Sequence, residues 1–208
     1  MRAEKLDTEI RREQIAEAAL NLVANSGLRR LSIAAVAKRV GLVPSGIYRH
    51  FPNKEAILAA VLDLLQQRLD DIVRAALAEA DQPLDQLRAV LLRHVRFIRE
   101  GRAIPRIIFS DEVHADHPQR KERLRRILGG YIEQLAGIIA RGQELRQIRA
   151  DIDPHTAALL FLGMVIPAGI FWQLSDGGFD VTRHAVKSWH LYREMLVAQQ
   201  TTGSSITE

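Results

Sequence analysis

The 208-residue sequence predicts an all-α protein, with a small helix-turn-helix domain at the N-terminus and a larger helical domain behind it. Apolar residues recur at intervals of three and four along almost the whole chain, which is the spacing of one helix face. No segment of strand length alternates β-branched with polar residues. Glycine, proline and helix-capping residues divide this pattern into separate helices.

The first three predicted helices are close together in the sequence. The first carries an apolar face and ends at Gly27, which can adopt the left-handed conformation found after helix C-termini. Ser32 caps the second helix and Gly41 ends it, and a very short third helix runs from Pro44 to His50. Two short helices joined by a glycine turn match the geometry in which the second helix enters a DNA major groove.

The remaining predicted helices form the larger domain. Asn53 is a good cap for a long helix through Ala80 that would connect the two domains. Further helices are expected over 84–100, 104–113 (broken), 119–145, 154–174 and 181–198. We therefore predict a DNA-binding domain over 1–54, a helical domain over 55–200 and a disordered tail over 201–208.

Positive charge is concentrated in the first quarter of the chain. Residues 1–54 hold ten Lys and Arg against five Asp and Glu, a net charge of +5, whereas the rest holds 19 against 20, a net charge of −1. This asymmetry is expected when one small domain faces a polyanion such as DNA.

Composition also limits the cellular compartment in which the protein can work and the kinds of chemical site that it can carry. The absence of cysteine excludes disulfides, thiolate metal sites and cysteine nucleophiles, and it fits a reducing cytosol. The N-terminus lacks the apolar stretch of an export signal. The uncharged run 157–172 is shorter than the ~20 residues of a membrane span and contains Gly163, Pro167 and Gly169. We therefore expect a buried helix there and a cytoplasmic protein with no membrane partner.

Residues 12–58 carry a recognisable motif. The segments LSIAAVAKRVGL over 31–42 and GIYRHFPNKEAIL over 46–58 closely resemble the DNA-binding domain of the TetR family of bacterial transcriptional regulators. The resemblance covers about a quarter of the chain; beyond it, only length and helix count are similar. It implies a DNA-binding surface made by the following residues: Ser32, Arg39, Pro44, Ser45, Gly46, Tyr48, Arg49, His50 and Lys54.

The candidate DNA-binding residues have distinct expected roles. By resemblance, Tyr48 and His50 would contact phosphates, while Pro44, Ser45, Gly46 and Arg49 would face base edges or the groove wall. The Ser32 side chain can cap its helix and also meet a phosphate, because free N–H groups at a helix N-terminus favour an anion. Val43 departs from the family, in which Ser or Thr often caps the recognition helix.

Arg49 and Lys54 leave two interpretations each. The Arg49 guanidinium can pair bidentately with guanine, or it can contact a phosphate. A lysine in the first turn of a helix opposes the helix dipole, and a nearby phosphate would relieve that placement. The alternative for Lys54 is a solvated side chain.

The resemblance further implies that the larger domain dimerises through its last two helices and encloses an inducer pocket. A stripe at helical spacing in the last helix is the candidate dimer interface, with packing inside its own subunit as the alternative: Ala185, Trp189, Tyr192 and Leu196. Aromatic and soft apolar residues are candidates for the pocket, with core packing as the alternative: Phe97, Phe109, Phe161, Met164 and Phe171. Such a lining predicts a small hydrophobic or amphipathic effector.

Two polar clusters have simpler explanations than a site. One acidic and histidine cluster precedes Pro118 in a helix-breaking stretch, and we interpret it as a solvated loop and not a metal site: Asp111, Glu112, His114, Asp116 and His117. One basic run is interpreted as a solvated helix face rather than a second DNA contact: Arg120, Lys121, Arg123, Arg125 and Arg126.

These features predict a homodimeric, ligand-responsive repressor that binds a palindromic operator on double-stranded DNA. The alternative is an architectural or protein-regulated DNA-binding protein on the same scaffold, without a small-molecule pocket. No nucleotide-binding loop, serine elbow or metalloprotease motif is found, so we expect neither an enzyme nor a cofactor nor a metal.

Overall fold

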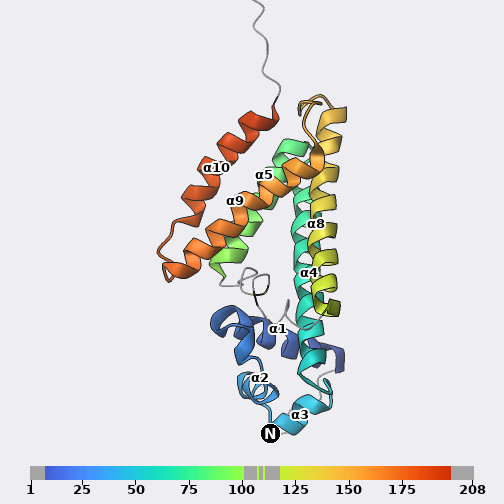
Figure 1. The fold of residues 1–208 in the computed structure, drawn as a ribbon, viewed down its shortest axis with the longest axis vertical. Coiled ribbons are helices and arrows are strands. Elements are labelled where there is room, and N and C mark those ends of the chain that lie inside the picture. The colour runs from blue at the N-terminus through green and yellow to red at the C-terminus, as the bar shows by residue number, and fades with distance from the viewer. Residues whose placement is uncertain (1–7, 101–106, 108–109, 111–117, 198–208) are drawn as a thin grey trace, which may run out of the picture.

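The computed structural model describes residues 8–100, 107, 110 and 118–197, and the regular structure in these ranges is entirely helical (Figure 1). The predicted all-α fold is therefore confirmed. The α-helices in this part of the chain are, in order, α1 (Thr8–Ser26), α2 (Ile33–Val40), α3 (Pro44–Tyr48), α4 (Lys54–Glu79), α5 (Pro83–Arg99), α8 (Pro118–Glu144), α9 (Pro154–Leu174) and α10 (Val181–Leu196).

Local sequence signals set the ends of the first helices. The Ser32 hydroxyl accepts a hydrogen bond from the Ala35 N–H at 3.1 Å, as expected for an N-cap. Gly41 ends α2 in the left-handed conformation, with φ of 68°. One element was not predicted: a single 3-10 turn over Leu28–Arg30, which carries the Leu28 side chain into the core.

Helix α4 connects the N-terminal helices to the larger domain without a break. The Asn53 side chain caps it by accepting a hydrogen bond from the Ala56 N–H at 2.8 Å. The helix packs against α1, α5 and α8. One cluster of buried apolar side chains runs from Ile15 in α1 to Leu196 in α10.

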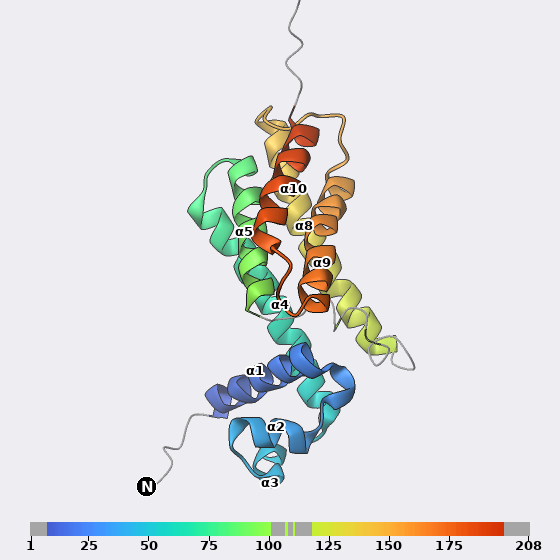
Figure 2. The ribbon, with the colours of Figure 1, turned by 90° about the vertical axis from the view of Figure 1, so that its left-hand side faces the viewer.

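The larger domain is built on α4, α5 and α8, with α9 and α10 side by side on one face (Figure 2). Helix α9 is long and apolar enough to cross a membrane, judged by length and composition alone. Of its most apolar 18 residues, only 39% are buried. The expectation of a buried helix was therefore only half right. One face of α9, with Ala158 and Phe161, is buried in the domain, and the opposite face is exposed and apolar.

A buried polar pair joins α5 to α8. His94 Nε2 and the Tyr131 hydroxyl form a hydrogen bond, and their rings pack edge to face with centroids 5.5 Å apart. Both side chains are only 2% exposed. Burial lowers the pKa of His94 to about 4 and raises the pKa of Tyr131, because both charged forms are disfavoured away from water.

Acidification is expected to destabilise the protein through His94. Between its folded pKa of about 4 and its ordinary value of 6.5, the unfolded chain binds a proton that the folded chain rejects. The neutral His94 ring therefore contributes its full stability above the pKa of 6.5 that it has in the unfolded chain. This stability is lost as the pH falls toward its pKa of about 4 in the folded protein. Because a difference of one in pKa corresponds to about 1.4 kcal/mol, the total loss is about 3 kcal/mol. Urea unfolding between pH 7 and pH 4 measures this slope.

The matched control is His94→Gln, which retains a polar partner for Tyr131 but does not titrate. We expect its free energy of unfolding to depend less on pH than that of the wild type over the same range. An identical slope in both proteins would show that His94 does not account for the acid sensitivity.

Candidate DNA-binding interface

The α2–α3 unit lies at one end of the molecule, with α3 on its outer side (Figure 1). Val36 of α2 and Ile47 of α3 are fully buried and hold the two helices together. On α3 the side chains of Pro44, Ser45 and Tyr48 are exposed, and that of Tyr48 is 56% exposed. A short helix that buries Ile47 and exposes Ser45 and Tyr48 can offer these two polar side chains to a DNA groove.

The turn before α3 contains Val43, the residue at which the sequence departs from the TetR pattern of a capping Ser or Thr. This residue is the N-cap, it makes no side-chain hydrogen bond, and it is 66% exposed. Pro44 follows at the first helical position, where its fixed φ favours helix initiation. A Cβ atom added at Gly46 would meet Leu42 Cβ at 3.6 Å, an ordinary contact. The protein itself therefore does not require glycine at position 46, and the missing side chain leaves room for close approach of a partner.

His50 is held by a residue that the sequence analysis missed. The Arg12 guanidinium donates a hydrogen bond to the His50 carbonyl oxygen and lies 4.5 Å from the centre of the Phe51 ring. Both contacts attach α1 to the segment between α3 and α4. Arg12 is the first residue of the TetR-like stretch, which is the signal that could have drawn attention to it.

The remaining candidates surround α3. Arg49 is exposed at the C-terminal end of the helix, and Arg39 is exposed in the last turn of α2. Ser32 is also exposed, while His50 and Lys54 are half-buried. Lys54 is the first residue of α4, where the positive end of the helix dipole disfavours a cation and a phosphate would stabilise it.

Profiles of known families match most of the chain. Residues 15–61 match the profile described as bacterial regulatory proteins of the tetR family. Residues 80–196 match the profile described as the tetracyclin repressor-like C-terminal domain. The chain belongs to the TetR family. It is therefore a transcriptional regulator with a helix-turn-helix DNA-binding domain.

Individual TetR-family relatives are distant but nearly full-length. The chain is 24% identical over 173 residues to the fatty acid metabolism regulator protein of Bacillus subtilis, covering 81% of this chain and 86% of the relative. It is 23% identical over 194 residues to the nucleoid occlusion factor SlmA of Actinobacillus pleuropneumoniae, covering 92% and 95%. The crystal structure of FadR from Bacillus subtilis in complex with stearoyl-CoA has the same fold, with a TM-score of 0.73, 22% identity and coverage of 88% and 98%.

The stripe predicted as a TetR-type dimer interface is buried inside its own subunit. Ala185, Trp189, Tyr192 and Leu196 are between 0% and 7% exposed. The Tyr192 hydroxyl donates a hydrogen bond to the Ala157 carbonyl oxygen at 2.8 Å, and its ring packs edge to face on Phe161. The stripe thus attaches α10 to α9. This packing agrees with the alternative interpretation of the stripe, because helical spacing identifies an apolar face but not what covers it.

The predicted effector-pocket residues do not share one environment. Phe97 and Phe161 are buried in the core and Met164 is partly buried against it, whereas Phe171 is 56% exposed and packs on Phe179. Phe109 lies outside the described residues, as does the acidic and histidine cluster over 111–117. In the described part of the chain, no group of three or more His, Asp or Glu side chains could hold a metal ion.

Replacing Lys54 with alanine is expected to weaken binding to all DNA sequences by a similar factor. A phosphate contact carries no base information, and its loss removes about one released counterion from the salt dependence. Fluorescence anisotropy with operator and with random DNA, at several salt concentrations, measures both effects. A solvated lysine, the alternative interpretation, would leave the slope of log K against log salt unchanged.

Replacing Arg49 with alanine is expected to relax the base preference instead. A bidentate arginine–guanine contact contributes about 1–3 kcal/mol of discrimination against the wrong base. Selection of bound sequences from a randomised DNA pool, for the wild type and the variant, tests this directly. If the two proteins select the same sequences and Arg49→Ala only lowers the salt dependence, Arg49 contacts a phosphate.

Proposed function

We propose that the chain is a homodimeric, ligand-responsive repressor that binds a palindromic operator and is released from it by an effector with an acyl chain. The observation that supports DNA binding most directly is α3, whose polar side chains are exposed at the end of the molecule. A two-fold dimer would place two such helices about 34 Å apart, in successive major grooves of one DNA face.

An exposed apolar face on α9 and α10 supports the homodimer. Six large apolar side chains are exposed on these two adjacent helices, and together they define the α9–α10 face: Leu159, Leu160, Phe171, Leu174, Val186 and Leu191. On α9 they follow helical spacing and are joined by the exposed Gly163 and Pro167. Several large exposed apolar side chains on adjacent helices are typical of protein interfaces, and a second copy of the chain would cover them.

The proposed effector rests on the fatty-acid regulators. One distant relative is a fatty acid metabolism regulator, and a solved structure with the same fold holds stearoyl-CoA. A ligand that prefers a DNA-incompetent arrangement would shift the population toward release.

The likeness to nucleoid occlusion factors favours a second candidate. SlmA of Actinobacillus pleuropneumoniae matches over a longer part of the chain than the fatty-acid regulator does, at nearly equal identity. In this alternative the chain binds many chromosomal sites and is controlled by a protein partner rather than by a small molecule.

One experiment separates the two candidates. Selection of genomic DNA fragments with the purified protein yields the binding sites, and stearoyl-CoA is then titrated into the complex. A few sites near genes of lipid metabolism, with release by stearoyl-CoA, would support the repressor. Many dispersed sites and no release would favour the architectural function.

A further inference from the structure

The recognition helix α3 begins with an exposed apolar side chain, that of Val43. This side chain is 66% exposed, more than that of Tyr48 on the same helix at 56%, and it makes no hydrogen bond. The next residue, Pro44, is exposed as well. The N-terminal end of α3 is therefore apolar, whereas Ser45 and Tyr48 provide polar groups further along the helix.

The backbone on both sides of Val43 is held in place. The Leu42 side chain packs against the core, and the Leu42 N–H donates a hydrogen bond to the Ala37 carbonyl oxygen at 2.9 Å. The Val43 carbonyl oxygen accepts a hydrogen bond from the Gly46 N–H at 2.8 Å. Since a β-branched side chain has a restricted χ1 angle, little conformational freedom is lost when a partner contacts Val43.

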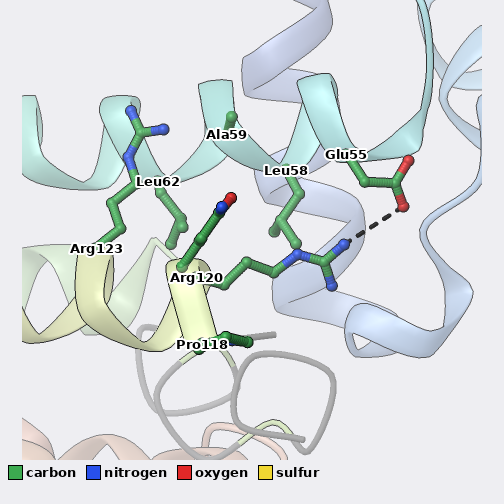
Figure 3. Close-up of a pocket in the computed structure, with 8 residues that line it drawn as sticks. Glu55, Leu58, Ala59, Leu62, Pro118, Arg120 and Arg123 are labelled. Atoms are coloured by element: carbon green, nitrogen blue, oxygen red, sulfur yellow. Dashed lines mark hydrogen bonds and ion pairs between the residues drawn. The ribbon is translucent and has the colours of Figure 1, made fainter. Parts of the chain in front are cut away.

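The segment that follows α3 is also attached to the rest of the molecule. Phe51 is 1% exposed, and its ring lies under the Arg12 guanidinium of α1. In the first turn of α4, Glu55 Oε1 lies 3.4 Å from Nη2 of Arg120 in α8 (Figure 3). Arg120 thus contacts α4, although the sequence analysis placed it on a solvated face. These contacts fix the position from which α3 presents Val43.

The N-terminal end of α3 offers few hydrogen-bond donors to a DNA backbone. The Val43 side chain has none, Pro44 has no N–H, and the Gly46 N–H already donates to Val43. Valine is also one of the poorest N-cap residues, so the stability of α3 does not account for its presence. What this end of the helix offers a partner is apolar surface.

One chemical group in the DNA major groove matches an apolar side chain. The edges of the base pairs present hydrogen-bond donors and acceptors there, and thymine adds its C5-methyl group. In helix-turn-helix proteins, the N-terminal residues of the recognition helix contact base edges in this groove. Val43 lies at that end of α3.

We propose that Val43 determines part of the operator sequence by packing its methyl groups on the C5-methyl group of one thymine in each half-site. Cytosine, which has no methyl group at this position, is disfavoured there. This inference rests on the proposed binding of a palindromic operator and deepens it by naming one base that the protein selects.

Deoxyuridine in place of thymidine tests the methyl contact, because uracil pairs as thymine does and lacks only the methyl group. Selection from a randomised DNA pool with the full-length protein yields the operator. Each thymine is then replaced in both half-sites, and fluorescence anisotropy measures the affinity. One buried methyl group corresponds to about a fourfold change in affinity, so at one position we expect binding to weaken about 15-fold.

The variant Val43→Ser separates this contact from a general effect of deoxyuridine on the DNA. Serine is a good N-cap, so the variant is expected to fold, but it has no methyl groups. It is expected to bind the thymine and uracil operators equally at the sensitive position. Val43→Ala, with a shorter apolar side chain, is expected to show an intermediate loss. Equal losses for the wild type and both variants would overturn the proposal.

The matched control is Ile10→Ser, because Ile10 is an apolar residue that is 47% exposed on α1, outside the α2–α3 unit. We expect this variant to keep the full sensitivity of the wild type to deoxyuridine. If no replacement weakens the wild type, Val43 contacts no thymine methyl group, although the proposed operator-binding repressor stands. A wild type that selects no sequence from the pool would instead contradict the proposed function, and this proposal with it.

Discussion

Replacing Leu191 with glutamate is expected to convert the protein to a monomer and to weaken operator binding by more than about 100-fold. Leu191 is 71% exposed on α10 and belongs to the α9–α10 face. A buried, unpaired carboxylate in an apolar interface costs several kcal/mol, enough to separate the two subunits of the proposed dimer. A monomer contacts only one half-site, so the large gain in affinity that comes from linking two half-sites is lost.

Light scattering after size-exclusion chromatography measures the mass, and fluorescence anisotropy with a selected operator measures the affinity. Leu77→Glu is the matched control, because Leu77 is also exposed and apolar but lies on α4, outside the α9–α10 face. We expect this control to retain the mass and the affinity of the wild type. A Leu191→Glu protein that remains dimeric would place the interface elsewhere.

The second large effect is expected from Phe51→Ala, which should unfold the DNA-binding unit at temperatures where the larger domain stays folded. Phe51 is 1% exposed and packs beneath the Arg12 guanidinium. Removal of a buried phenyl ring costs about 3–5 kcal/mol, a large fraction of the stability of a small unit. The loss of its ring also removes the cation–π contact that attaches α1 to the segment after α3.

Circular dichroism during heating and anisotropy with operator DNA measure this change. We expect loss of operator binding together with retention of most helical signal at room temperature. Phe51→Leu, which leaves a smaller cavity, is expected to cost less and to keep measurable binding. Full operator affinity in Phe51→Ala would contradict the role of this ring in holding the recognition helix.

The DNA-binding unit could be predicted closely because its signals are local. Ser32, Gly41 and Asn53 fix helix ends through hydrogen bonds and backbone conformations that involve neighbouring residues only. The short distance between these signals leaves few ways to arrange the three helices. Resemblance then added the candidate DNA-binding residues, which packing patterns alone do not distinguish from other exposed side chains.

The larger domain was less predictable because its features depend on contacts between distant residues. The stripe with Trp189 and Tyr192 is apolar whether its own α9 or a partner covers it, and only the fold shows that α9 does. Likewise, the pairing of Arg123 with Asp63 joins residues 60 positions apart, so the basic run gave no sign of this contact with α4. Phe171 lies on the outer side of α9, which periodicity in an almost wholly apolar helix cannot reveal.

The continuity of α4 has a geometric consequence for regulation. Its 26 residues make a rod of about 39 Å at 1.5 Å per residue. A tilt of only about 5° at one end displaces the other end by about 3 Å, the full length of a hydrogen bond. Two subunits that tilt in opposite senses would change the spacing of their recognition helices by about twice that distance, against a DNA repeat of about 34 Å. Loss of operator fit thus requires no unfolding and no change in any DNA-contacting residue, only a small angle magnified by the length of one helix.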